Sequence, residues 1–358
     1  ADTPGGPSFF VFEAGTPGLF PGKHEDKHGI RASDTCPISL EDLFVPVENL
    51  IGGVEGQGLK QANQVFGYTR LMVATFGLGG GMAALEKAIA YGKERIQFGG
   101  PLVEKQGYTH QLLVPHAVRL EAARAYVEKT AQRLDTGEQD LQVEGSVSKY
   151  FATEVGDAAA NDAIQALGGY GYVREFEVEK IKRDIKITTI FEGTSEIQRS
   201  IISTFRLRET VRSKGRFYLD MAEALEKLPP GCGAQTVARS IRLLNDVVLN
   251  TRKHKLTRSQ YVMFLLADMM TWCEVGAALC QKAATGQGSG RPPEFLKAVA
   301  RLFALEVETK VLVNGTKIGQ GCGEPMGDVV PKLKALDLGE TSAGFMADMD
   351  QVAAEIVR

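Results

Sequence analysis

The sequence predicts a mainly α protein, in which an up-down bundle of four helices follows a short β section and precedes a helical extension. Three observations support this prediction. Residues 59–212 carry apolar residues at helical spacing with short connections, which favours antiparallel neighbours. Residues 1–52 alternate polar and apolar residues between turn-forming glycines and prolines, as strands do. Beyond residue 236 the helical spacing returns in two stripes: Val237, Ile241, Leu244, Val248 and Leu296, Val299, Phe303, Val307, Val311.

The composition is that of an ordinary soluble protein with room for two or three domains. The chain has 358 residues, of which 44% are hydrophobic and 24% charged, and its net charge is −3. The well-mixed charges argue against a nucleic-acid partner held by phosphate contacts. No stretch approaches the length of uncharged apolar residues that crosses a bilayer, so no transmembrane helix is expected. The cysteines and histidines make no metal-ligand spacing, which predicts a reducing compartment and no metal.

The first predicted domain is residues 1–52. Residues 8–12 form a short apolar run, and residues 33–46 alternate polar and apolar positions before Gly52 and Gly53 close the section. Both patterns predict strands.

The second predicted domain is the bundle, residues 53–212. Its expected helices are 59–93, 103–135 with a bend at Pro115, 141–166, a short one at 177–184, and 195–212. The glycines between Gly77 and Gly81 invite comparison with a phosphate-binding loop, but Met82 occupies the last glycine position and no strand precedes them. Close helix packing is the better account of these small residues.

The remainder is predicted to be a linker, 213–236, and a smaller C-terminal helical domain, 237–358. The linker contains the breaker cluster at residues 228–233, and residues 259–283 are apolar enough to be buried. Four cations follow the first helical stripe: Arg252, Lys253, Lys255 and Arg258. They either complement a helix C-terminus or contact an anionic membrane surface.

Residues 191–199, FEGTSEIQR, are the strongest candidate for chemistry. Ser195 and Gln198 fit a capping box, so a helix is expected to begin near Thr194 or Ser195. Glu192 then lies just ahead of free backbone N–H groups, where phosphates bind well. An apolar approach favours the neutral form of a carboxyl group, which suits a general base. The alternative is a capped turn without a catalytic role.

Two further segments strengthen the catalytic interpretation. Arg95-Ile96-Gln97-Phe98-Gly99 is followed by Gln106, and residues 165–172 read QALGGYGY. In this order and spacing, the three segments resemble the acyl-CoA dehydrogenases, and the chain is identified as a member of that family. The match covers its C-terminal portion, with an extension like that of the very-long-chain branch. The family's N-terminal helical domain and first β strands have no counterpart, so a missing N-terminal portion is an expected partner, without which FAD binding and activity are expected to be poor.

The resemblance implies an FAD-dependent α,β-dehydrogenation of an acyl-CoA to the trans-2-enoyl-CoA, with Glu192 as base and flavin as hydride acceptor. It implies a homodimer or dimer of dimers, in which one subunit contacts the neighbour's FAD and also its own. The positions matching contacts to the neighbour's FAD are Arg95, Gln97, Phe98, Gln106, Gln165, Gly168 and Gly169; those matching contacts to the subunit's own FAD are Thr194 and Glu196.

Arg70 and Gly193 are assigned by the resemblance to the substrate, Arg70 to the CoA part. Gly67 stands where the family usually has an acidic residue, which weakens half of that CoA contact. Thr69 occupies the place where some branches carry their base, and a threonine cannot serve as one, which favours Glu192.

The expected electron acceptor is electron-transfer flavoprotein, and the expected location is the bacterial cytoplasm or mitochondrial matrix, with peripheral membrane contact through the extension as an option. Two other functions remain open: an oxidase of the same fold that is reoxidised by oxygen, and a scaffold or assembly protein that keeps the fold without turnover.

Overall fold

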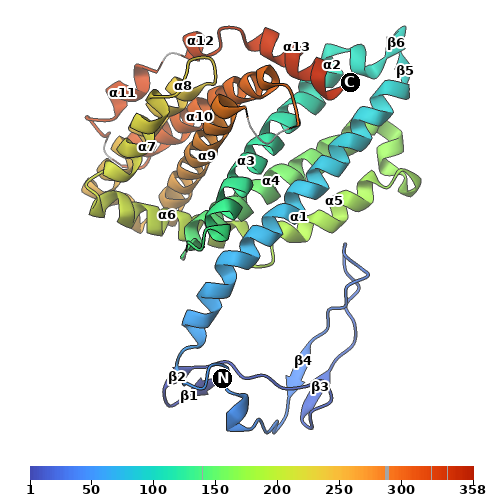
Figure 1. Cartoon of the computed structure of the whole chain (residues 1–358), viewed down its shortest axis with the longest axis vertical. Helices are drawn as coiled ribbons and strands as arrows, with labels where there is room; N and C mark the ends of the chain where they lie inside the picture. The colour runs from blue at the N-terminus through green and yellow to red at the C-terminus, as the bar shows by residue number, and fades with distance from the viewer. Residues whose placement is uncertain (139, 287–289, 324, 337) are drawn as a thin grey trace.

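The chain is mainly helical, as the sequence predicts (Figure 1). A computed structural model describes residues 1–138, 140–286, 290–323, 325–336 and 338–358. Helices α1 to α6 form the bundle and α7 to α13 the extension, while the β section lies apart beneath the N-terminal half of α1 (Figure 1).

Helix α1, Gly58–Glu94, and helix α4, Gln142–Leu167, are the central pair of the bundle. They touch backbone to backbone where glycines face each other. A Cβ on Gly77 would lie 2.7 Å from the Cα of Thr153, and one on Gly81 would lie 2.7 Å from the Cα of Gly156. The prediction that these small residues permit close packing is confirmed, because any side chain there would push the helices apart.

The second bundle helix differs from its prediction. The expected helix 103–135 is divided into η2, Leu102–Glu104, α2, Gln106–Tyr108, a π-helical turn η3, Thr109–Leu113, and α3, Val114–Asp135. Pro115 lies in the first turn of α3, directly after the π-helical turn. The interruption of the regular helix therefore falls beside the position where the bend was expected.

The rest of the bundle closely follows its prediction. Short 3-10 turns η4, Gly168–Tyr172, and η5, Arg174–Phe176, lead to α5, Val178–Lys186, and η6, Ile187–Thr189, leads to the candidate catalytic turn. Helix α6, Ser195–Arg212, then completes the four long antiparallel helices with α1, α3 and α4.

The extension is helical throughout most of its described residues. Its main helices are α7, Arg216–Glu226; α8, Ala234–Lys253; α9, Gln260–Thr285; and α10, Pro293–Gly321, with the short turn η7, Leu256–Arg258, before α9. Three shorter helices follow: α11, Val330–Lys334; α12, Leu338–Thr341; and α13, Phe345–Ile356.

Helix α9 is the one helix in the described parts of the chain that is long and apolar enough to span a membrane by length and composition. Buried residues make up 78% of its most apolar window. Trp272 stacks on Phe303 of α10 and meets Phe151 of α4 edge to face, so α9 packs as a core helix between bundle and extension.

Residues 213–236 differ from the predicted linker. Helix α7 lies within them, and its Tyr218 is completely buried with its hydroxyl on Glu274 of α9. The buried apolar side chains of the bundle and of the extension form one continuous cluster.

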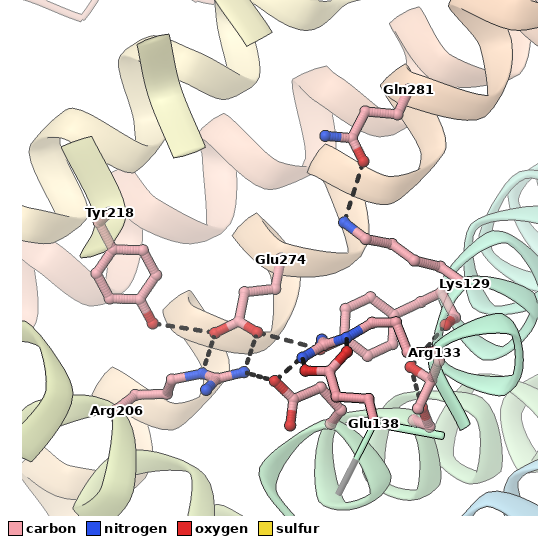
Figure 2. Close-up of polar contacts among 11 residues, drawn as sticks. Lys129, Arg133, Glu138, Arg206, Tyr218, Glu274 and Gln281 are labelled. Carbon is pink, nitrogen blue, oxygen red and sulfur yellow. Dashed lines mark hydrogen bonds and ion pairs between the residues drawn. The ribbon is translucent and has the colours of Figure 1, made fainter. Parts of the chain in front are cut away.

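A buried polar network ties the bundle to the extension, with Glu274 of α9 at its centre (Figure 2). Its carboxylate accepts hydrogen bonds from Arg206 Nε and Nη2 of α6, at 2.8 and 2.9 Å, and from the hydroxyls of Tyr126 and Tyr218. Arg206 also donates to Glu144 of α4. Charged groups are usually buried in this way, paired with the opposite charge and hydrogen-bonded to it.

The β section contains short two-stranded sheets only, within the described residues. Strand β1, Asp2–Thr3, pairs with β2, Gly6–Pro7, and β3, Leu19–Pro21, pairs with β4, Ile38–Leu40. The expected strand at residues 8–12 makes one bridge, from Phe10 to Leu50. Between β3 and β4 the chain reaches α5, where the N–H of Ile30 donates to Asp184. Residues 47–49 form the 3-10 turn η1, Val47–Asn49.

Candidate functional site

The candidate catalytic turn, residues 190–194, has an unusual backbone. Glu192 has a φ of 56° and Gly193 a φ of 90°, so both lie in the left-handed region. For a residue with a side chain this conformation costs about 1 kcal/mol or more, and the surroundings must hold it. Gly193 is required for a second reason, because a Cβ there would lie 2.7 Å from Nε2 of Gln198.

Thr194, and not Ser195, is the N-cap of α6. The Thr194 Oγ1 accepts the backbone N–H of Ile197, whereas Ser195 is buried and donates its hydroxyl to Glu154 of α4. The predicted capping box between Ser195 and Gln198 is therefore wrong, although the predicted start of the helix is confirmed. Since the side chain of Gln198 points back to the turn, its role differs from that of a cap.

The carboxylate of Glu192 is half-buried between α1 and the turn. Thr69 of α1 donates its hydroxyl to Glu192 Oε2 at 2.9 Å. Thr69, which cannot itself act as a base, thus orients the carboxylate of Glu192, the candidate base.

Arg70 lies next to Thr69 but is buried, with 5% of its surface exposed. Its guanidinium donates to Ser146 of α4 at 3.3 Å and lies over the ring of Phe66, while its Nε has no partner among the described residues. Burial lowers the pKa of Arg70, and the negative charge of Glu192 acts in the opposite direction. Arg70 therefore adds positive potential beside the candidate base.

The backbone N–H of Glu192 has no acceptor within the described ranges, whereas the carbonyls of the turn are strongly held. Lys149 of α4 donates its ammonium to the Gly193 carbonyl at 2.8 Å. The amide of Gln198 donates to the carbonyls of both Glu192 and Gly193, each at 2.9 Å. Sequence reasoning missed Lys149 altogether, because it is 44 residues from Gly193 in the chain.

The segment from Arg95 to Gly99 forms a second cluster, at the C-terminal end of α1. Residues 96–97 and 100–101 pair as the hairpin β5, Ile96–Gln97, and β6, Gly100–Pro101. Its tip carries Phe98, which has a φ of 51° and is 85% exposed. Arg95 and Gln97 are exposed as well. Gln106 of α2 is also exposed, and its amide donates to Asp350 of α13.

The segment containing Gln165, Gly168 and Gly169 meets this cluster. Tyr91 of α1 packs edge to face against Tyr170, with 6.0 Å between ring centroids. Gly168 has a φ of 60°, and a Cβ built on it or on Gly169 would meet nothing within 4 Å. An exposed backbone therefore faces open space near the end of α1 that carries Arg95. Backbone N–H groups, a guanidinium and amide side chains are donors of the kind that fit the pyrophosphate and adenosine of a dinucleotide.

The two clusters lie far apart on one chain. Thr69, which contacts Glu192, and Glu94, which precedes Arg95, belong to the same continuous helix α1. The 25 residues between them, at about 1.5 Å each, span roughly 37 Å. One flavin cannot bridge that length with its ring at Glu192 and its phosphates at Arg95 of the same chain.

The described residues contain no group of three or more histidine, cysteine, aspartate or glutamate side chains that could hold a metal ion. All five cysteines are free, and Cys232, Cys273 and Cys280 are buried.

Comparison with known proteins matches residues 56–206 to the family described as acyl-CoA dehydrogenase, C-terminal domain. An acyl-CoA dehydrogenase of Bacillus subtilis is 42% identical over 205 residues, which are 57% of this chain and 53% of that protein. The mitochondrial short-chain specific acyl-CoA dehydrogenase of rat is 41% identical over 203 residues, 57% of this chain and 48% of that protein. The chain thus spans about half the length of the curated relatives it matches.

One solved structure resembles nearly the whole chain, extension included. It is an acyl-CoA dehydrogenase from Bacillus anthracis complexed with FAD, with a TM-score of 0.82 over 98% of this chain and 65% of that one. At 22% sequence identity, this likeness establishes the fold.

Proposed function

Because residues 56–206 of this chain belong to the acyl-CoA dehydrogenase family, we propose that the protein catalyses the FAD-dependent α,β-dehydrogenation of an acyl-CoA thioester to the trans-2-enoyl-CoA. The observation that carries the proposal is the turn at Glu192. Its half-buried carboxylate is oriented by Thr69, and the N–H beside it has no acceptor within the described residues.

Glu192 is assigned as the base that removes the α-proton. A thioester α-proton is far too weakly acidic for a carboxylate unless the developing enolate oxygen is stabilised. The free N–H of Glu192 is suited to donate to that oxygen, at the end of a turn that leads into α6. The partial positive charge at the helix start and the charge of Arg70 favour the same build-up of negative charge.

The proposed contacts with FAD lie in both clusters. Arg95, Gln97, Phe98, Gln106, Gln165, Gly168 and Gly169 are exposed together at one end of α1, and Thr194 and Glu196 lie at the start of α6. When bound, FAD supplies the hydride acceptor for the β-hydrogen. The separation of the clusters along α1 supports a homodimer, in which each flavin is shared between the Glu192 end of one chain and the Arg95 end of another.

The relatives support further proposals. Electron-transfer flavoprotein is the proposed acceptor, and the bacterial cytoplasm or mitochondrial matrix the proposed location, since relatives include a bacterial and a mitochondrial enzyme. Arg70 and Gly193 are the proposed substrate contacts. Because Arg70 is buried and its guanidinium lies over the ring of Phe66, it would contact CoA only through the small part of its surface that is exposed, or influence the substrate through Glu192. Peripheral membrane contact through the cations near the end of α8 stays a prediction; Lys253 among them pairs with Asp328.

The test is to co-express the chain with the N-terminal portion that the family resemblance leads us to expect, to offer a panel of acyl-CoAs to the FAD-loaded protein under anaerobic conditions, and to follow bleaching of the flavin absorbance. We expect bleaching by some chain length, and we expect Glu192→Gln to bind FAD normally but to bleach at least 100-fold more slowly. Glu209→Gln, on the same helix α6, is the matched control and should behave as wild type.

Bleaching by Glu192→Gln at more than a few per cent of the wild-type rate would refute the assignment of the base. Oxygen uptake with acyl-CoA and no other acceptor would indicate an oxidase, and FAD binding without bleaching by any acyl-CoA would indicate a scaffold.

A further inference from the structure

Two buried donors converge on the carbonyls of the catalytic turn. Lys149 is completely buried, and its ammonium is 2.8 Å from the Gly193 oxygen. Gln198 is also completely buried, and its amide nitrogen serves the oxygens of both Glu192 and Gly193. Both acceptors are carbonyls, so the NH2 side of Gln198 must face them.

The two donors reach the turn from different helices. Lys149 lies on α4, whose packing against α1 is fixed by the facing glycines, and Gln198 lies in the first turn of α6. A third contact fixes the junction, where the buried Ser195 donates to Glu154 on α4. The turn is therefore held on one side by the rigid central pair of helices and on the other by its own following helix.

We infer that Lys149 and Gln198 are positioning residues, which hold the turn in its left-handed conformation so that the carboxylate of Glu192 faces the substrate. The catalytic purpose of this geometry rests on the proposed function, whereas the hydrogen bonds that define the geometry do not depend on it. Holding the carbonyls of Glu192 and Gly193 fixes the planes of the two peptide units that they belong to, and so fixes the backbone on both sides of Gly193 and directly after Glu192.

The charges around Lys149 are consistent with this role. Burial lowers its pKa to about 8, while Glu154 on its own helix, Glu196 at the start of α6 and Glu192 in the turn act in the opposite direction; Arg70 of α1 adds to the lowering. A pKa of about 8 still leaves the side chain mainly charged at neutral pH, and an ammonium forms a stronger hydrogen bond to a carbonyl than a neutral amine.

The turn itself shows why such holding is needed. Glu192 occupies a conformation that a residue with a side chain avoids, and Gly193 adopts a φ that favours glycine. Without the donors, the two buried carbonyls would lack partners, and the turn would relax toward an ordinary conformation. The carboxylate would then lose its alignment with the α-proton, and a misplacement of about 1 Å can cost 100-fold in rate.

The experiment compares Lys149→Met and Gln198→Met, which keep the side-chain volume and remove the donors. Lys129→Met is the matched control, because Lys129 is another lysine whose pKa is lowered by burial and whose ammonium donates to a side chain, Gln281, outside the turn. Hydrogen exchange of residues 190–199, measured by mass spectrometry, reports on the turn without any flavin. Anaerobic bleaching by acyl-CoA, with the acyl-CoA Kd measured separately, reports on positioning.

We expect exchange at residues 190–199 to increase at least 10-fold in both donor variants and not in Lys129→Met. We expect bleaching to slow by 10- to 100-fold while the Kd for acyl-CoA changes less than 3-fold, since alignment and not binding is lost. The double variant should be less impaired than the product of the two single effects, because both donors hold the same carbonyl.

Unchanged exchange in both variants would overturn the inference, as would an effect confined to the Kd. If wild type shows no bleaching with any acyl-CoA, the proposed function fails, and the exchange measurement alone decides whether the two residues hold the turn. If Lys149→Met does not fold, Gln198→Met, whose removal leaves no buried charge, decides the outcome.

Discussion

The hydroxyl of Thr69 donates to the carboxylate of Glu192 across 123 residues of sequence. It joins the long helix α1 to the turn that precedes α6, and it fixes one of the two carboxylate oxygens. The other oxygen is then left to meet the substrate. Thr69 cannot itself act as a base, but its hydrogen bond sets the orientation of the carboxylate that is the candidate base.

Replacing Thr69 tests this relationship. Thr69→Val has the same shape but no donor, so we expect acyl-CoA bleaching to slow by about 5- to 30-fold, as the loss of one hydrogen bond of about 1 to 2 kcal/mol implies. Thr69→Ser keeps the hydroxyl and should retain most of the rate. Stopped-flow absorbance at 450 nm (roughly the flavin maximum) is the measurement for both. Equal rates for Thr69→Val and Thr69→Ser would show that the hydroxyl plays no part.

The distance between the two clusters predicts that two chains build each flavin site. Arg95→Ala should impair the flavin site at one end of α1, and Glu192→Gln should disable the base near the other. In a mixed dimer of the two variants, one site receives both defects and the other receives neither. Random mixing in equal amounts should therefore recover about a quarter of the wild-type activity, although each variant alone is inactive.

Co-expression with two different affinity tags, followed by isolation of the mixed dimer, is the measurement; the isolated mixed dimer has one intact site of two and should show about half of the wild-type activity. A mixture of Glu192→Gln with a second inactive variant in the same cluster, Gly193→Val, is the control and should recover nothing. Recovery equal to that of this control would mean that both clusters serve one flavin within one chain.

The network around Glu274 predicts a large effect on stability. Glu274 is 4% exposed, and Glu274→Gln removes one of the two carboxylates that pair with the buried Arg206, leaving Glu144 as the other. Breaking a buried pair by removing one partner costs about 3 to 5 kcal/mol; because Glu144 remains, we expect a loss near the lower end, about 3 kcal/mol, in the free energy of unfolding. Denaturation by urea, followed by circular dichroism, gives the value.

The control for that measurement is Glu226→Gln, which breaks the well-formed but partly exposed pair with Arg242. Exposed pairs contribute about 1 kcal/mol or less. If the two substitutions destabilise the protein equally, the Arg206–Glu274 pair does not anchor the extension to the bundle.

Sequence periodicity predicted the long helices well because each one buries a continuous apolar face. Helix α1 was expected at 59–93 and is found at Gly58–Glu94, and α6 begins and ends where it was expected. Helix α7 was missed inside the expected linker, since the proline and glycine cluster that follows it dominated that stretch. Its apolar residues do recur at helical spacing, at Phe217, Tyr218, Met221, Ala222 and Leu225, and this signal could have revealed it.

The candidate site could be predicted only where its residues are neighbours in sequence. Glu192, Gly193 and Thr194 lie together in one motif, and the structure contains a turn at these residues directly before α6, as the motif predicts. Lys149 and Thr69 come from other helices, and no local spacing indicates that a lysine 44 residues away will meet the carbonyl of Gly193. The error at Ser195 has a similar cause, since Glu154 of α4 takes the hydroxyl that a cap would have used.

The last prediction concerns whether the bundle can fold independently of the extension. The sequence suggests that the bundle could fold without residues 213–358, but the described contacts favour one cooperative unit. A chain that ends at Arg212 lacks Asp268 and Glu274, so Arg199 and Arg206 lose their partners on α9. It also uncovers Phe151, which packs against Trp272 and Phe303.

We therefore expect the chain that ends at Arg212 to retain helical circular dichroism but to lose a sharp unfolding transition and to bind a hydrophobic dye. The full chain under the same conditions is the control. A cooperative transition in the shortened chain, with no dye binding, would establish the bundle as an independent domain and leave α9 as a helix that covers it without being required for its packing.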